Sequence, residues 1–334
     1  MERVTERRRR AGLRDRRRPR KLRRVLLVLA GFLVAGVAGA GSYFLPVLTA
    51  AVAITGHTSE LPSPSAGGAA PAPAPNAPFT VLLLGSDDDA KFSKDHVLTQ
   101  SMILVRVTPA THHVAMLSIP RDLWVPISSG GTAKIDAAYS DGGARTAIAT
   151  VEQDFNVHVD HYVWTGLRGL IALVDAVGGV DMVASNPVMD DFYPRDLDTS
   201  NPYAYQRVAV LPGAQHMNGA EALQYVRSRH GDLREDFGRS ERQQQLLLAL
   251  RAKTKGMSAA NLPDLAGALN GEMSTDMSIG QLISLLPLVS GLATTDIERI
   301  ILLPPYTHGG DIAGQSVVLP DWTLIRPLVA QTFP

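Results

Sequence analysis

Residues Phe79–Ile119 read FTVLLLGSDDDAKFSKDHVLTQSMILVRVTPATHHVAMLSI, and they predict the centre of the fold. It contains three apolar runs, each with the length of a β-strand: FTVLLLG (Phe79–Gly85), SMILVRV (Ser101–Val107) and HVAMLSI (His113–Ile119). Runs so rich in Val, Ile, Leu and Met suit strands in the middle of a sheet covered on both faces. We therefore expect them to form the centre of one buried sheet.

Helical and strand-like segments alternate through the rest of the folded sequence. Asn218 is placed to cap a short helix. Further strands are expected at His158–Trp164, Val180–Ala184 and Ile297–Leu303, and helices at Gly143–Phe155, Leu167–Val177, Gly238–Lys255 and from Ser278. The alternation predicts an α/β fold (α+β-like and layered), with a central, mostly buried β-sheet flanked by helices on both faces.

The N-terminal part predicts a membrane anchor. Residues 1–24 hold thirteen Lys and Arg and three acids, and residues 25–48 carry no charge over a length that spans a bilayer. The positive-inside rule keeps the basic tail in the cytoplasm, so the expected localisation is single-pass in the cell membrane with the C-terminal domain extracytoplasmic. A cleaved signal peptide is the alternative, because small residues such as Ala38 and Ala40 suit a cleavage site.

The expected domains follow from composition. Residues 49–78 form a Pro/Ala/Gly-rich linker, residues 79–255 a core domain, and residues 256–334 its helical completion. Outside the basic tail the chain has 19 basic and 29 acidic residues, so the overall charge of zero averages two unlike regions. The basic tail adjoins the expected span, where it meets anionic lipid, and we expect no nucleic acid partner. The absence of cysteine excludes disulfides and thiol catalysis.

The stretch Ala222–Gln245 (ALQYVRSRHGDLREDFGRSERQQQ) gathers five arginines. Guanidinium groups bind phosphate oxygens in a bidentate manner, so the cluster is typical of a site for a charged oxyanion. The alternative is a surface helix with ion pairs. Arg227 and Arg229 cannot share one face of a regular helix, so either the helix frays near Ser228 or only one of them is a ligand.

Three further segments carry candidate site residues. LLLGSDDD (Leu82–Asp89) places acids at the end of a buried strand, where hard oxygen ligands suit Mg²⁺, although a solvated turn has the same composition. LSIPRDLWVPI brings Arg121 out of a strand end behind a rigid proline. KIDAAYSDGG supplies Lys134 for a phosphate and Tyr139 for a hydroxyl, with a packed core tyrosine as the alternative.

These segments occur in an order that resembles the LytR-CpsA-Psr family, also labelled the cell envelope-related transcriptional attenuator domain. Its members are membrane-anchored enzymes that ligate phosphate-linked glycopolymers to peptidoglycan. The matching segments cover about half of the chain: LLLGSDDD, SMILVRV, LSIPRDLWVPI, KIDAAYSDGG, HYVW, LIALVDAVGGVD, LPGAQHMNGAEALQYVRSRHGD and DFGRSERQQQLLLAL.

The resemblance implies a Mg²⁺-dependent phosphotransferase that moves a glycopolymer from a polyprenyl-pyrophosphate carrier to peptidoglycan. An apolar pocket would receive the polyprenyl tail, and no obligate protein partner is implied. The residues implied at the pyrophosphate are Arg121, Arg227, Arg229 and Arg239, with Lys134, Tyr139, Arg242 and Gln243 as further substrate-binding residues.

Two departures from the family pattern concern the metal site. Asp87 matches a magnesium-binding aspartate, but Asp89 stands where the family usually has arginine. Gln100 replaces the second metal-binding aspartate, and Leu98 replaces another arginine. The expected metal ligands are therefore Asp87 and Gln100, or a carboxylate of the intervening loop in place of Gln100 (Asp88, Asp89 or Asp95).

Three other functions are considered for the same residues: a pyrophosphatase, a silent binder of lipid-linked glycan and a regulator of transcription. Water in place of the sugar hydroxyl would give a pyrophosphatase, and the altered metal site favours a catalytically weak or silent binder of lipid-linked glycan. A regulator of transcription is disfavoured, because the expected cytoplasmic part is two dozen residues that form no DNA-reading module.

Overall fold

The computed structural model describes residues 77–87, 97–198, 200–201, 203–229, 235–254, 262–269, 272–277, 281, 285, 288–289 and 291–334. The expected tail, membrane span and most of the linker lie outside these residues, as do Asp88, Asp89, Asp95 and the helix start at Ser278. Among the described helices, none is both long and apolar enough to cross a bilayer.

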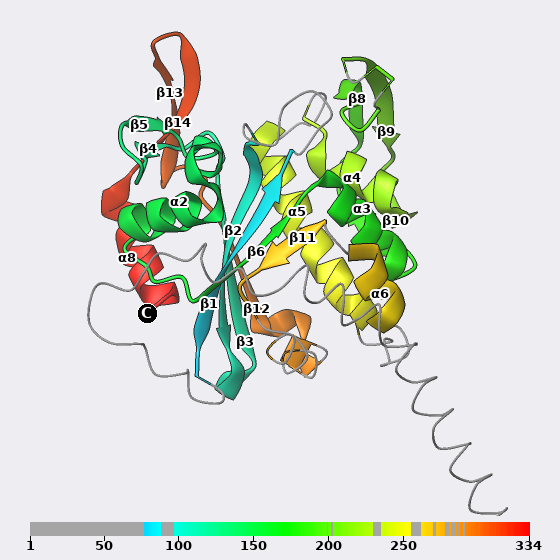
Figure 1. Ribbon diagram of the computed structural model, residues 1–334, viewed down its shortest axis with the longest axis horizontal. Coiled ribbons are helices and arrows are strands. Elements are labelled where there is room, and N and C mark those ends of the chain that lie inside the picture. Colours follow the sequence, from blue (N-terminus) through cyan, green and yellow to red (C-terminus); the bar gives the residue numbers. More distant parts are fainter. Residues whose placement is uncertain are drawn as a thin grey trace, which may run out of the picture. The chain divides into compact units, whose positions relative to one another are not determined.

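A six-stranded mixed sheet forms the centre of the described fold (Figure 1). Its strand order is β11-β6-β1-β2-β3-β12, with β1 and β6 parallel, β3 and β12 parallel, and β2 antiparallel to both its neighbours. The three runs quoted from Phe79–Ile119 form its middle, as expected. The strands are β1 (Phe79–Ser86), β2 (Thr99–Thr108), β3 (His113–Ile119), β6 (His161–Thr165), β11 (Met273–Thr275) and β12 (Ile297–Ile301).

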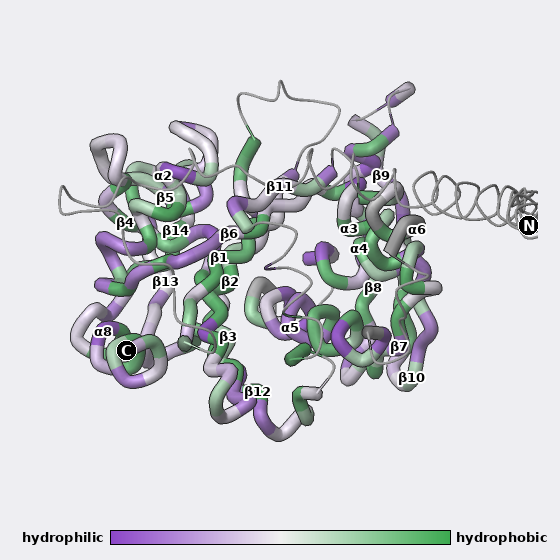
Figure 2. The backbone as a smooth tube through the Cα atoms, turned by 60° about the horizontal axis from the view of Figure 1, so that its bottom comes forward, coloured by the Kyte–Doolittle hydropathy of each residue, from purple (hydrophilic) through white to green (hydrophobic). Residues whose placement is uncertain are grey.

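Helices cover both faces of this sheet. On one face, α2 (Ala137–Phe155) and α8 (Trp322–Thr332) pack on alternate residues of β2 such as Leu104. On the other face, α5 (Glu235–Thr254) packs on the residues between them, such as Ile103. Because successive side chains of a strand point to opposite faces, strands that are apolar at every position suit this sandwich. Figure 2 shows the central strands as largely hydrophobic.

A second layer of elements packs beside the sheet around its own apolar cluster. Asn218 caps α4 in a full capping box with Glu221, which confirms the expected helix start. Gly219 is required there, because a Cβ would lie 2.3 Å from the carbonyl oxygen of Ile171 on the neighbouring helix. These elements are α3 (Leu167–Ala176), α4 (Gly219–Arg227), α6 (Leu262–Leu269), β7 (Val180–Ala184), β8 (Val188–Pro194), β9 (Tyr205–Val210) and β10 (Gly213–Met217).

Two expected boundaries differ from the structure. Helix α2 begins at Ala137 rather than Gly143, because a kink at Gly142 and Gly143 joins two helical segments. Gly143 has φ 67°, a conformation that glycine adopts without strain. Strand β6 begins at His161 rather than His158. The chain first reaches the sheet at Asp160, whose backbone N–H donates to the carbonyl oxygen of Thr80 at 2.9 Å.

Residues 256–334 are less helical than the expected helical completion, because their described part contains three further strands besides the one expected at Ile297–Leu303. This part supplies both edge strands of the central sheet, β11 and β12. Edge strands are only partly buried and can carry polar residues, so they lack the continuous apolar run by which the central strands are predicted. The remaining short elements are β4 (Trp124–Pro126), β5 (Thr132–Lys134), β13 (Thr307–Ile312), β14 (Gln315–Pro320) and the 3-10 turns η3 (Pro109–Thr111) and η5 (Thr294–Asp296).

Because helices cover both faces of the sheet, truncation of a side chain at its centre should markedly lower the free energy of unfolding. Leu104 is fully buried, so Leu104→Ala should lower the free energy of unfolding by about 2–5 kcal/mol through lost burial and a residual cavity. Leu324, which is 39% exposed on α8, is the matched control, and Leu324→Ala should cost less than about 1 kcal/mol. Urea unfolding measures both, and equal losses would contradict the arrangement.

Candidate functional site

The candidate residues gather at one edge of the sheet. Strands β1, β3 and β6 run in the same direction, so their carboxyl ends meet at this edge. Asp87 follows β1, Arg121 follows β3, and Gln100 lies at the start of the antiparallel β2 beside them. Open α/β sheets bind ligands at such an edge, so the topology brings together residues that the sequence keeps apart.

Asp87, Gln100 and Arg121 form a continuous hydrogen-bonded chain. The Nε2 of Gln100 donates to Asp87 Oδ2 at 2.6 Å, and the backbone N–H of Leu98 donates to Asp87 Oδ1 at 3.0 Å. Arg121 in turn donates from Nη1 to Gln100 Oε1. The neutral amide therefore links a carboxylate to a guanidinium and fixes the positions of both.

Asp122 holds two cations at the same edge. Its carboxylate accepts from Arg121 Nε at 3.3 Å and from Lys134 Nζ at 2.7 Å. Burial alone would raise the pKa of Asp122. The hydrogen bond from Lys134 and the positive charges of Arg121, Lys134 and Arg229 outweigh burial, and the pKa of Asp122 lies below its ordinary value. This carboxylate orients Arg121 and Lys134, and its pair with Arg121, which the sequence allowed as a surface ion pair, is largely shielded from solvent.

Asp136 is a residue that sequence reasoning missed. It precedes α2 with 6% of its surface exposed, and its side chain does not cap that helix. Burial raises the pKa of Asp136 to about 6; Arg121 and Lys134 oppose this shift, whereas the negative charges of Asp122 and Asp87 add to it. Asp136 could have been identified from the sequence as an acid directly before a helix, within the same segment KIDAAY that supplied Lys134 and Tyr139 as candidate site residues.

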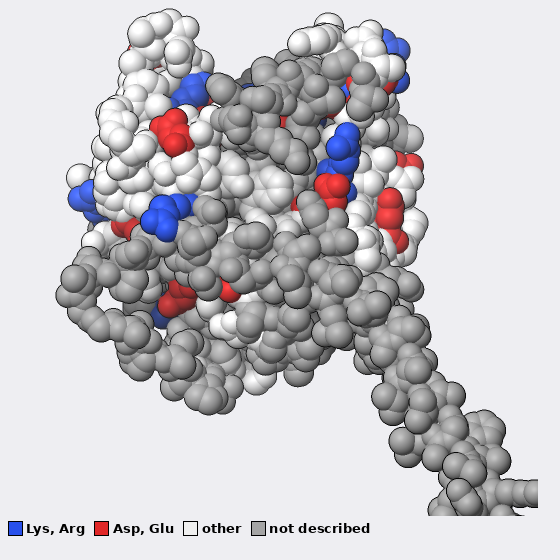
Figure 3. Space-filling model, viewed as in Figure 1, with Lys and Arg blue, Asp and Glu red and all other residues white. Residues whose placement is uncertain are grey.

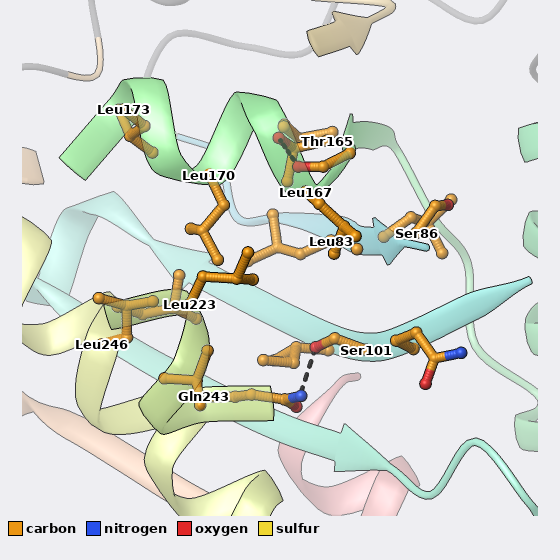
Figure 4. A pocket seen from close by; sticks show the side chains of 18 of the residues that line it. Leu83, Ser86, Ser101, Thr165, Leu167, Leu170, Leu173, Leu223, Gln243 and Leu246 are labelled. Atoms are coloured by element: carbon orange, nitrogen blue, oxygen red, sulfur yellow. Dashed lines mark hydrogen bonds between the residues drawn. The ribbon is translucent and has the colours of Figure 1, made fainter. Parts of the chain in front are cut away.

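An apolar cavity of about 190 Å³ opens at this edge (Figure 4). Leucines from β1, α3, α4 and α5 converge on it, including Leu83, Leu170, Leu223 and Leu246. Its polar lining residues are Ser86, Gln100, Ser101, Thr165, Arg227 and Gln243. The cavity thus joins a hydrocarbon-lined interior to the hydrogen-bonded chain through Gln100.

Gln243 and Arg227 contribute to the cavity from helices. The Oε1 of Gln243 accepts from Ser101 Oγ at 3.0 Å, which ties α5 to the start of β2. Helix α4 ends at Arg227 and Ser228 leaves the helical conformation, which is one of the two alternatives that the spacing of Arg227 and Arg229 allowed. The Nη2 of Arg227 pairs with Asp196 Oδ2 at 2.5 Å, so this carboxylate positions the guanidinium.

The remaining candidate arginines lie in different surroundings. Arg229 is exposed and its charge reaches Asp122, which places it at the same edge. Arg239 is buried in α5. Arg242 is also buried and donates to the carbonyl oxygens of Tyr225 at 2.7 Å and Ser228 at 2.6 Å, so it fastens the end of α4 to α5. This role differs from the substrate contact expected of Arg242.

Tyr139 takes the packed alternative. Its ring stacks on Trp164 with centroids 6.1 Å apart, against the core cluster beneath α2. Trp164 donates from Nε1 to Ser86 Oγ at 2.6 Å, at the polar end of the cavity. Tyr139 is thereby connected through Trp164 to Ser86, which lines the cavity.

The expected metal ligands Asp87 and Gln100 lie side by side at this edge and are joined by a hydrogen bond. Each oxygen of Asp87 accepts a hydrogen bond, and the oxygen of Gln100 accepts from Arg121. Within the described ranges, no group of three or more His, Cys, Asp or Glu residues is placed to hold a metal ion.

The chain therefore has a layered α/β fold with an apolar cavity that opens beside arginine side chains. The LytR_cpsA_psr family matches residues 49–318, and the chain belongs to this family.

Relatives agree with this placement. The polyisoprenyl-teichoic acid–peptidoglycan teichoic acid transferase TagV of Bacillus subtilis is 34% identical over 229 residues, 67% of this chain and 56% of that protein. Biofilm regulatory protein A of Streptococcus mutans is 34% identical over 213 residues, 60% of this chain and 50% of that protein. The chain thus spans about half the length of these relatives.

Solved structures share the fold. The crystal structure of B. subtilis TagV superposes with a TM-score of 0.63 at 27% identity, covering 78% of this chain and 98% of that one. The crystal structure of protein gbs0355 from Streptococcus agalactiae gives a TM-score of 0.64 at 28% identity, covering 77% and 86%. The mixed sheet flanked by helices is therefore the architecture of this family's structures.

Truncation of the buried Arg242 and of the exposed Arg229 should have different effects on stability. Arg242→Ala removes two charge-assisted hydrogen bonds to buried carbonyl oxygens and should lower the free energy of unfolding by about 2–3 kcal/mol. Arg229→Ala, at an exposed side chain, should change it by less than about 1 kcal/mol. Chemical denaturation compares the two, and an Arg242→Ala variant of wild-type stability would refute the structural role.

Proposed function

We propose that this protein is a phosphotransferase that moves a glycopolymer from a polyprenyl-pyrophosphate carrier to peptidoglycan. The names of the relatives support this class of reaction, since TagV is named as a transferase of teichoic acid from a polyisoprenyl carrier to peptidoglycan. The observation that carries the proposal for this chain is the leucine-lined cavity that ends at the Asp87–Gln100–Arg121 chain.

The cavity matches the two chemical parts of such a donor. A polyprenyl tail is purely hydrocarbon, and burial in a leucine-lined cavity stabilises it by about 25 cal/mol per Å² of apolar surface removed from water. A pyrophosphate at the polar end would meet Arg121 and Arg227, with Arg229 nearby at the sheet edge. The donor is thereby oriented along one axis, with its phosphates outside the hydrocarbon region.

The reaction is a displacement at phosphorus. A sugar hydroxyl of peptidoglycan forms a bond to the glycan-linked phosphorus and loses its proton, the bond from that phosphorus to the bridging oxygen breaks, and polyprenyl phosphate leaves with that oxygen and takes up the proton. Phosphoryl transfer depends mainly on positioning and on stabilisation of charge on the phosphate oxygens. Arg121 is suited to this role, because Gln100 and Asp122 hold its guanidinium at two separate nitrogen atoms.

The proposal includes a location. Residues 25–48 anchor the chain in the cell membrane, residues 1–24 remain in the cytoplasm, and the folded part lies outside it. A membrane anchor keeps the cavity near the surface in which a polyprenyl carrier resides, so lipid, lipid-linked glycan and peptidoglycan are the proposed partners.

A silent binder of lipid-linked glycan is the second candidate. It is favoured by Gln100, whose neutral amide stands between Asp87 and Arg121 where the family pattern has a carboxylate. A binder would use the same cavity without displacement at phosphorus, so turnover separates the two functions.

The turnover experiment uses the full chain in lipid vesicles with a polyprenyl-pyrophosphate glycan and peptidoglycan. Wild-type protein should attach the glycan to peptidoglycan, and Arg121→Ala should lower kcat by roughly 10²–10³-fold through lost charge stabilisation. Arg207→Ala, at an exposed ion pair with Asp191, is the control and should retain activity. Release of polyprenyl phosphate without acceptor would indicate a pyrophosphatase, and tight lipid binding without turnover would indicate the silent binder.

Magnesium dependence is part of the proposal and has its own test. Gln100→Asp would place a second carboxylate beside Asp87, so Mg²⁺ affinity should rise, because a hard dication gains more from an anionic ligand than from an amide. Asp87→Ala should lose most Mg²⁺ binding. Calorimetric titration of Mg²⁺ into each variant measures both. Unchanged or weaker binding in Gln100→Asp would indicate that a carboxylate of the Asp88–Asp95 loop already acts as the second ligand.

A further inference from the structure

A second cavity of about 210 Å³ lies next to the apolar one. It is enclosed by the carboxyl end of β8 and the segment after it, by Gln206 of β9, and by α3 and α4. The two cavities share three lining residues, Leu167, Leu223 and Arg227. They are therefore neighbours separated by the side of α4 that ends in Arg227.

The wall between the cavities is rigidly built. Asp196 pairs with Arg227 at 2.5 Å, and the guanidinium carbon of Arg227 lies 5.9 Å from the centre of the Tyr193 ring. Asp196 is 3% exposed and Tyr193 is 5% exposed, so the contact is shielded from water. A group bound against this wall would meet Arg227, which also lines the apolar cavity.

The charges around the second cavity are balanced. Asp196 is paired with Arg227, and Asp198 is paired with Arg195 at 2.5 Å while it also accepts from the backbone and hydroxyl of Ser200. On the face of the molecule shown in Figure 3, acidic and basic side chains likewise lie beside each other. A cavity without net charge gives no advantage to an anion or a cation, and favours a neutral ligand.

Two amide side chains give the cavity its hydrogen-bonding capacity. Gln206 of β9 and Gln224 of α4 both line it, and neither side chain forms a hydrogen bond within the described part of the chain. Each amide has two N–H donors and one carbonyl acceptor. Together they present donors and acceptors to a ligand from two different elements.

Apart from the two amides, the paired charges and Tyr193, the lining of the second cavity is apolar. Leu167, Ile171, Pro194, Ala220 and Leu223 contribute carbon surface around the two amides. A ligand that fits must therefore be neutral, carry several hydroxyl or amide groups, and have apolar faces between them. Sugar rings have this combination, since their C–H groups and hydroxyls lie on different sides of the ring.

We propose that this second cavity binds a saccharide unit next to the pyrophosphate during transfer. The inference rests on the proposed function, because it assigns the cavity to the glycan of that reaction. Either the donor glycan or the peptidoglycan acceptor supplies the sugar, since both have the same chemistry. The apolar cavity holds the lipid, the shared Arg227 faces the phosphates, and the second cavity holds the carbohydrate.

The test compares ligands with and without sugar on the full-length protein. Gln206→Ala combined with Gln224→Ala should weaken binding of a polyprenyl-pyrophosphate saccharide, or of a peptidoglycan glycan fragment, roughly tenfold to thirtyfold, as expected for two neutral hydrogen bonds. Binding of polyprenyl pyrophosphate without sugar should stay unchanged. Gln215→Ala is the matched control, because this glutamine lies on β10 outside both cavities and bonds to Leu211.

The outcomes separate this inference from the proposed function. A loss confined to the saccharide donor assigns the cavity to the donor, and a loss confined to the glycan fragment assigns it to the acceptor. Equal losses for sugar-bearing and sugar-free lipid, or none for any ligand, would overturn the saccharide site. If wild-type protein binds none of the lipids, the proposed function fails as well.

Discussion

Burial of both faces of the three central strands is the constraint on which the other features depend. Strands that are apolar at every position cannot leave either face in water, so helices must cover both, and here α2 and α8 lie on one face and α5 on the other. Because helices cover both faces, the ends of the strands are the part of the sheet that a ligand can reach. The polar residues that follow β1 and β3 are thereby concentrated at one edge, beside a cavity between the sheet and its helices.

Carboxylates set the orientation of the arginines at this edge. Asp122 holds Arg121, and Asp196 holds Arg227, each through an ion pair that is largely shielded from solvent. Paired in this way, a guanidinium loses less side-chain entropy when an anion binds, because its rotamer is already selected. The same pairing limits the net positive charge, so the site favours a ligand that also contributes apolar and neutral polar groups.

Gln100 shows how one substitution changes the character of a site. An aspartate between Asp87 and Arg121 would add a negative charge suited to a dication. The glutamine instead donates to Asp87 and accepts from Arg121, which joins them without a charge of its own. Asp136, whose pKa is raised to about 6 by burial, lies in the same electrostatic environment. The balance of charge at this edge therefore depends on neutral and partly protonated groups as well as on arginines.

The central strands and the helix cap at Asn218 could be predicted from the local sequence, because each depends on residues close together in the chain, whereas the helix end near Ser228 was one of two alternatives. It also indicated Asp87, Gln100 and Arg121 as site residues. Only the tertiary structure decided that Gln100 bridges the other two, that Arg242 fastens α4 to α5, and that Asp196 positions Arg227. Those contacts join segments far apart in sequence, and short-range periodicity carries no information about which distant side chains meet.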